Sequence, residues 1–234
     1  MASMEERVLA IQQRIREAEC ESGRASGSVT LVAASKMNDA AAVRAAYAAG
    51  IRCFGENRVQ ELVDKRTQGA YEGARLHLIG HLQKNKVKFV AGQVDLIESV
   101  DSLALMEAIE KRCAAQGTTQ DVLLEVNLAG EASKTGMPLS QLPAILEEAG
   151  RFSCVQVKGL MGIPPAGAKS AENRAYFARM HELFVDIRGK KYDNVSMAEL
   201  SMGMSGDFED AIREGSTMVR IGTAIFGARD YGLF

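Results

Sequence analysis

Short apolar runs alternate with segments of helical periodicity along this chain of 234 residues. A run of about four to eight residues rich in β-branched side chains is typical of a parallel strand that is buried on both faces, whereas apolar positions three and four apart are typical of a helix. The runs predict strands over residues 29–36, 51–57, 76–80, 94–99, 121–127, 155–161, 195–201 and 218–225.

Helical segments separate these predicted strands and also precede them. Residues 4–20 carry one apolar stripe, formed by Val8, Ile11, Ile15 and Ala18. The same spacing predicts further helices over residues 39–49, 59–66, a basic stretch after Asn85, 102–115, 140–149, 171–188 and 207–214. This alternation favours the α/β class and a single (β/α)8 TIM-type barrel over residues 1–234, with an extra N-terminal helix and no second domain.

A doubly wound open sheet is the competing architecture. That fold commonly carries a G-x-G-x-x-G fingerprint after its first strand. Residues 33–36 read Ala-Ala-Ser-Lys and lack this fingerprint, and no linker rich in Gly, Ser or Pro divides the chain. The barrel is therefore the preferred prediction.

Composition and charge narrow the class of protein. The net charge of −2 and the sequence pI of about 6.0 give no basic field that points to nucleic acid. The cysteines have no paired spacing, which favours free thiols in a reducing compartment. No run is long and apolar enough to span a bilayer, and the first residues lack the apolar core of a signal peptide. We therefore expect a cytoplasmic protein without a membrane or nucleic-acid partner.

Polar or small residues stand at most carboxyl ends of the predicted strands. In a barrel these ends converge on one rim, where active sites lie. A partly desolvated lysine at such a rim can form a Schiff base with an aldehyde, and the alternative is a lysine that only reaches solvent. The strand-end residues are Lys36, Asn57, His81, Ser99, Asn127, Met161, Ser201 and Gly222 with Thr223.

The C-terminal quarter adds small residues after the seventh and eighth predicted strands, over 200–207 and 214–223. Free backbone N–H groups in such loops are typical of a phosphate site, and the alternative is that Gly and Ser only make tight turns. Arg220 lies within an apolar strand, so its guanidinium needs an acceptor such as a ring nitrogen or an anion. His77 and His81 flank a strand end, and we expect no metal site there.

Eight short motifs stand at or near the predicted strands. They are Val32–Lys36, Phe54–Asn57, Val59–Glu61, His77–Gly80, Leu82–Gln83, Gly159–Met161, Leu200–Ser205 and Gly215–Gly227. Together these motifs resemble the pyridoxal phosphate (PLP) homeostasis protein family. The resemblance implies a barrel similar to the N-terminal domain of alanine racemase, with pyridoxal 5′-phosphate carried as a Schiff base on Lys36. It also implies phosphate contacts at Ser201, Gly222 and Thr223, with Arg220 facing the pyridine nitrogen and both Asn57 and Met161 near the ring.

The resemblance and the chemistry of the residues favour a PLP carrier over an enzyme. An arginine at the pyridine nitrogen opposes ring protonation and weakens the electron sink. Racemisation needs a second acid–base group, and only residues 230–234 follow the barrel. We expect a monomer that buffers PLP or delivers it transiently to apo enzymes that depend on PLP, with indirect effects on amino-acid and keto-acid metabolism. A racemase-like PLP enzyme and a class I aldolase that uses Lys36 without PLP are the alternatives.

Overall fold

The strands lie where the apolar runs of the sequence predict them. The computed structural model describes residues 2–128, 130, 135–165, 167 and 169–227. Its strands are β1 (Thr30–Ala34), β2 (Cys53–Glu56), β3 (Arg75–Leu78), β4 (Leu96–Val100), β5 (Gln120–Asn127), β6 (Met137–Pro138), β7 (Val155–Met161), β8 (Val195–Met204) and β9 (Met218–Ile221).

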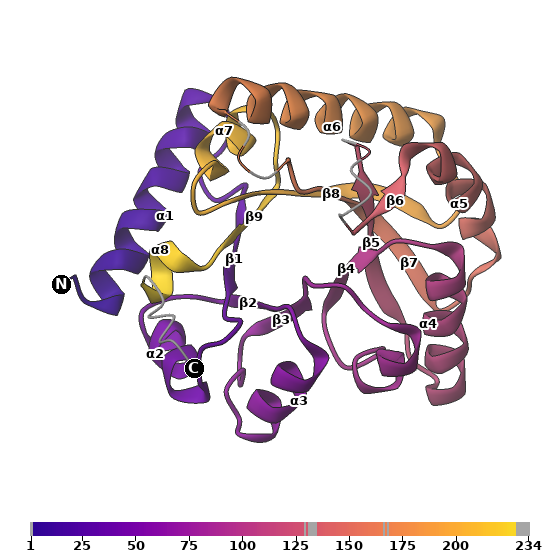
Figure 1. Ribbon diagram of the computed structural model, residues 1–234, viewed down its shortest axis with the longest axis horizontal. Helices are drawn as coiled ribbons and strands as arrows, with labels where there is room; N and C mark the ends of the chain where they lie inside the picture. Colours follow the sequence, from indigo (N-terminus) through magenta and orange to yellow (C-terminus); the bar gives the residue numbers. More distant parts are fainter. Residues whose placement is uncertain (1, 129, 131–134, 166, 168, 228–234) are drawn as a thin grey trace.

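Parallel pairing closes these strands into a barrel. The hydrogen-bonded order is β4-β3-β2-β1-β9-β8-β7-β5-β6, and an additional pairing of β4 with β5 completes the ring. The first strand, β1, lies between β2 and β9, so the first and last strands are neighbours in the sheet. Figure 1 shows the strands around one centre with the helices outside them. The predicted TIM-type α/β barrel is confirmed, and the short β6 is an addition beside β5 that the sequence did not indicate.

Helices follow most strands and cover the outside of the barrel, as expected for parallel crossovers. They are α1 (Met4–Glu21), α2 (Ala40–Ala48), α3 (Val59–Thr67), α4 (Leu103–Gln116), α5 (Leu142–Glu148), α6 (Ser170–Lys190), α7 (Phe208–Arg213) and α8 (Thr223–Phe226), with 3₁₀ helices η1 (Lys84–Phe89), η2 (Leu139–Gln141) and η3 (Ala149–Arg151).

Two predicted elements differ from the structure. The basic stretch after Asn85 is the 3₁₀ helix η1, in which only Val87 is buried, so it has no apolar stripe to hold a longer helix against the barrel. The last predicted strand ends at Ile221 instead of Ile225, because the chain turns at Gly222 into α8.

Two apolar layers follow from the alternation of side chains along each strand. Side chains that point outward, such as Phe54 and Leu78, pack with the helices in the larger cluster. Side chains that point inward fill the barrel with a smaller cluster, whose buried members are Val32, Ala34, Cys53, Ile79, Leu96, Leu123, Met161 and Met218.

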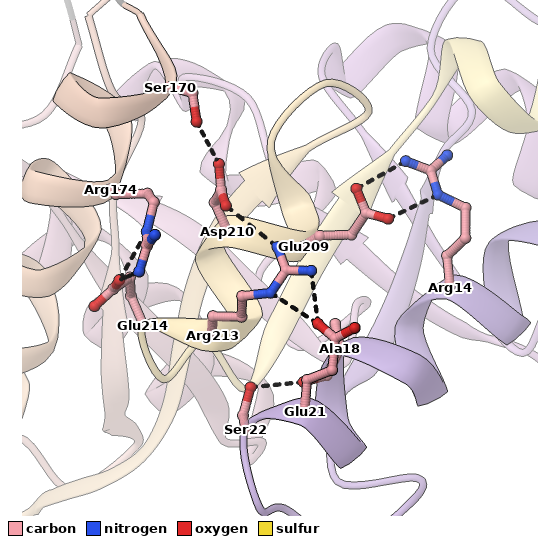
Figure 2. Close-up of polar contacts among 10 residues, drawn as sticks. All are labelled: Arg14, Ala18, Glu21, Ser22, Ser170, Arg174, Glu209, Asp210, Arg213 and Glu214. Carbon is pink, nitrogen blue, oxygen red and sulfur yellow. Dashed lines mark hydrogen bonds and ion pairs between the residues drawn. The ribbon is translucent and has the colours of Figure 1, made fainter.

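The leading helix α1 closes one side of the molecule. Ser3 and Glu6 form a capping box at its start, and its predicted apolar stripe is buried. Figure 1 places α1 beside α7 and α8. On the outer surface Arg14 pairs with Glu209 at 2.9 Å and Arg213 pairs with Glu21 at 2.7 Å, as Figure 2 shows. These exposed pairs orient α7 against α1 but contribute little free energy.

No helix in the described part of the chain combines enough length with enough apolar sequence to cross a membrane.

Gly159 provides a test of the β7–β8 contact. A Cβ atom at this position would lie 1.7 Å from the carbonyl oxygen of Glu199, so no side chain fits without separating the two strands. We expect Gly159→Ala to lower the free energy of unfolding by about 1–3 kcal/mol, measured by urea denaturation. Gly189→Ala is the matched control, because that position in α6 meets no atom within 4 Å, and it should leave stability equal or slightly raised. Equal stabilities for both variants would contradict this packing.

Candidate functional site

A cavity of about 280 Å³ opens at the carboxyl ends of β1, β8 and β9. The structure brings four predicted site residues to its wall, which are Lys36, Arg220, Gly222 and Thr223. The remaining lining residues are Ala34, Met204, Ser205 and Gly206. Because β1 and β9 are paired neighbours, residues about 190 positions apart in sequence share one rim.

The backbone on both sides of Lys36 is held in place. The Ser35 N–H donates to the Gly55 carbonyl at 3.0 Å, and the Met37 N–H donates to Glu61 Oε2 at 2.7 Å. Met37 has a φ of 60°, which is uncommon for a residue with a side chain and turns the chain sharply after Lys36. The lysine is half-buried. Its stem is therefore fixed to the barrel while its side chain reaches the cavity.

A buried ion pair behind Lys36 supplies much of this anchoring. Glu56 Oε1 accepts hydrogen bonds from Ser35 Oγ at 2.6 Å, Lys65 Nζ at 2.7 Å and Tyr71 Oη at 2.8 Å. Lys65 Nζ also donates to the Ser35 carbonyl at 2.8 Å. Burial and the Glu56 carboxylate raise the pKa of Tyr71, so the phenol remains a donor. The buried carboxylate of Glu56 thus supports the strand end that leads to Lys36.

The opposite wall of the cavity offers backbone donors to an anion. The Gly222 N–H donates to Ser205 Oγ at 3.3 Å, and a Cβ on Gly222 would lie 3.2 Å from the Ala34 carbonyl. The N–H groups of Ser205, Gly206 and Thr223 have no acceptor among the described residues. Small residues and free amides at this wall fit a phosphate group.

Arg220 lies on β9 at the base of the cavity and is 5% exposed. Its Nη1 donates to Ser201 Oγ at 2.5 Å, and its Nη2 donates to the Gly162 carbonyl at 3.1 Å. These two bonds fix the plane of the guanidinium. The arginine therefore presents a fixed donor and a permanent charge to whatever occupies the cavity.

The structure differs from the prediction at Ser201. This residue is fully buried inside the barrel, where its hydroxyl donates to Glu98 Oε2 at 2.6 Å and accepts from Arg220. Ser205, four positions later, lines the cavity instead. The reason is that β8 continues to Met204, three residues beyond the predicted end at Ser201, so the loop starts later than the apolar pattern indicates.

Asn57 and Met161 also lie outside the cavity wall. Asn57 follows β2 directly, and its backbone packs so closely on Gly80 that a Cβ there would lie 2.3 Å from the Asn57 carbonyl oxygen. Met161 is fully buried in the inner cluster. Their predicted contacts with a cofactor ring stay predictions.

Several acidic groups surround Arg220. Burial raises the pKa of Glu125, whose Oε1 accepts from Thr135 Oγ1 at 2.5 Å, and burial likewise raises the pKa of Asp207. Burial also raises the pKa of Tyr176 to about 12. Arg220 opposes each of these shifts. No three His, Cys, Asp or Glu side chains are placed to hold one metal ion in the ranges that the structure describes.

The sequence signal missed several residues that the structure brings together. Ser205 and Gly206 belong to the stretch 200–207 that the sequence indicates as a phosphate loop, but the predicted strand end placed Ser201 at the rim in their stead. His77 and Glu98 were harder to find, because an isolated polar residue in an apolar strand shows no partner in sequence. Their contact at 2.7 Å depends on the pairing of β3 with β4.

Known proteins give an independent comparison. The family described as alanine racemase, N-terminal domain, matches residues 9–230. The pyridoxal phosphate homeostasis protein of Pseudomonas aeruginosa is 43% identical over 232 residues, with 99% of this chain and 98% of the relative covered. The protein of the same name from Aquifex aeolicus is 41% identical over 226 residues, with 97% and 98% covered.

The solved structure of PipY from Synechococcus elongatus with PLP bound is similar along the whole barrel. It is 38% identical with a TM-score of 0.81, and the match covers 91% of this chain and 100% of PipY. The match to the alanine racemase N-terminal domain agrees with the barrel, and the curated relatives match it over nearly the full length of the chain. The chain belongs to the pyridoxal phosphate homeostasis protein family, within the fold of the alanine racemase N-terminal domain.

Proposed function

We propose that this protein binds PLP in the cavity, as a Schiff base on Lys36, and acts in the intracellular homeostasis of the cofactor. The observation that carries the proposal is the convergence of Lys36, Arg220 and the Gly222–Thr223 turn on one cavity. The names of its relatives and the PLP bound to PipY support the choice of cofactor. When bound, PLP supplies an aldehyde and an electron-withdrawing ring.

Each residue of the cavity has a proposed role in holding the group. Lys36 provides the amine, and the amides around Gly222, Thr223 and Ser205 bind the phosphate. Arg220 donates to the pyridine nitrogen, while Ser201 contributes through its bond to Arg220. Asn57 and Met161 flank the ring in this proposal.

The same arrangement favours a carrier over a racemase-like enzyme. A guanidinium at the pyridine nitrogen opposes ring protonation, and the proposed site assigns no second base on the far face of the ring. In this proposal residues 1–234 form one PLP-binding domain that acts as a cytoplasmic monomer. It buffers PLP or delivers it transiently to apo enzymes, with indirect effects on amino-acid and keto-acid metabolism. Exchange of the α-proton in a panel of amino acids by the PLP-loaded protein would favour the racemase-like alternative.

Lys36→Ala tests the amine. The variant should lose the visible absorbance of the Schiff base and the peptide trapped by borohydride, because no other amine is held at the cavity wall in the described structure. It should remain folded by circular dichroism and retain weak binding through the phosphate. The control Lys84→Ala, on the exposed η1, should keep the full spectrum.

A trapped adduct at Lys84 or another surface lysine, with an unchanged spectrum for Lys36→Ala, would remove the proposed site. A protein that binds no PLP but traps a sugar phosphate at Lys36 would favour the aldolase alternative.

A graded series at Gly222 tests the phosphate wall. A Cβ on Gly222 would lie 3.2 Å from the Ala34 carbonyl, so a larger side chain must push this wall into the space proposed for the phosphate. We expect Gly222→Ala to weaken PLP binding modestly and Gly222→Val to weaken it about tenfold to a hundredfold, the effect of losing about one hydrogen bond to a charged group. Equilibrium dialysis measures the affinity. Wild-type affinity in a folded Gly222→Val protein would place the phosphate elsewhere.

A further inference from the structure

A continuous chain of polar contacts runs through the inside of the barrel to Arg220. Cys53 Sγ lies 3.4 Å from His77 Nε2, and His77 Nδ1 lies 2.7 Å from Glu98 Oε1. The other carboxylate oxygen of Glu98 accepts from Ser201 Oγ at 2.6 Å, and Ser201 Oγ in turn accepts from Arg220. Each residue comes from a different strand of the ring.

These polar side chains are shielded from solvent. His77, Glu98 and Ser201 are 0% exposed, and they lie within the small inner layer of the barrel. An unpaired charge in such a place costs several kcal/mol. Each charged member must therefore be compensated by its neighbours, so the charge states along the chain are interdependent.

The carboxylate of Glu98 is the centre of this compensation. It contacts His77 on one side, and its Oε2 lies 3.8 Å from Arg220 Nη1 on the other. Burial favours the neutral acid, but His77, Arg220 and Ser201 outweigh burial and lower the pKa of Glu98. The carboxylate is thus ionised and holds a cation at each oxygen.

His77 is the second charged member. Burial opposes its charge, but the contacts with Cys53 and Glu98 outweigh burial and raise its pKa to about 10. Arg75 Nη2 lies 3.4 Å from His77 Nε2, and because a guanidinium is also a cation this neighbour opposes the charge of the imidazole. With His77 protonated, Glu98 ionised and Arg220 charged, these three side chains together carry one net positive charge below the cavity.

We infer that Glu98 and His77 are positioning residues for Arg220: Glu98 orients the guanidinium through Ser201, and the charged imidazole of His77 keeps the interior below the cavity net positive. The inference rests on the proposed function, because its consequence is that a ring nitrogen facing Arg220 stays unprotonated. Arg220 also faces the Gly162 carbonyl and, at longer range, Glu125, Asp207 and Tyr176. These groups are unchanged in the variants below.

The first experiment uses the protein without PLP. The sequence has three histidines, so the His81→Gln and His181→Gln proteins identify the imidazole signals of His77 by elimination in ¹⁵N NMR. Wild-type His77 should remain protonated across pH 6–8 and lose its proton only toward pH 10. In Glu98→Gln it should lose the proton at a lower pH. The control Glu19→Gln, which alters an equally buried carboxylate that binds the Val29 N–H, should leave His77 unchanged.

The pH dependence of the free energy of unfolding tests the charge of His77 a second way. Because the pKa of His77 is raised in the folded state, the charged imidazole stabilises the fold fully below about pH 6.5, and this contribution is lost as the pH rises through about 10. The difference in unfolding free energy between wild type and His77→Gln should therefore shrink at alkaline pH. A neutral His77 at pH 7 in the NMR titration would overturn the inference without bearing on PLP binding.

The last experiment adds PLP and follows its visible absorbance against pH. His77→Gln removes one positive charge below the ring, so protonation of the bound cofactor becomes easier. The titration midpoint should therefore rise by about 0.3–1 pH unit. Glu19→Gln should keep the wild-type midpoint. Equal midpoints for wild type and His77→Gln would overturn the inference, whereas a wild-type protein that binds no PLP would overturn the proposed function alone.

Discussion

The polar interior of this barrel depends on compensating one permanent charge, the guanidinium of Arg220. Arg220 cannot lose its proton and is 5% exposed, so the fold must surround it with acceptors. Ser201, the Gly162 carbonyl and the Glu98 carboxylate meet that need from three directions. Such a buried arrangement is weak as a source of net stability, but it restricts the guanidinium to one orientation.

Closure of the barrel brings this fixed arginine next to Lys36. The pairing of β1 with β9 sets Val32 opposite Arg220 and Ala33 opposite Ile221. The strand that precedes Lys36 and the strand that precedes Gly222 therefore bring an amine and a glycine turn to one rim. A separate set of polar contacts outside the barrel, around Glu56, holds the lysine's own backbone.

The polar clusters around Glu56 and Glu98 support different parts of the site. Glu56 lies between the strands and the helices, where it binds Lys65 and Tyr71, whereas Glu98 lies inside the ring. The contacts of Glu56 hold the backbone beside Lys36 in place. The contacts of Glu98 compensate the positive charge of Arg220. The exposed ion pairs between α1 and α7 in Figure 2 do neither for the cavity, because solvent screens them.

The sequence by itself determined the barrel and the rim that carries Lys36, Arg220, Gly222 and Thr223, because strand runs, helix spacing and the polar residues at strand ends are local patterns. Only the tertiary structure decided which serine lines the cavity. Ser201 pairs with Met218 and Met204 pairs with Arg220, so β8 advances three positions where β9 advances two. This shift carries Ser205 to the rim while Ser201 stays inside. The contact of His77 with Glu98 was equally hidden, since it exists only because β3 and β4 are neighbours whose inward faces meet.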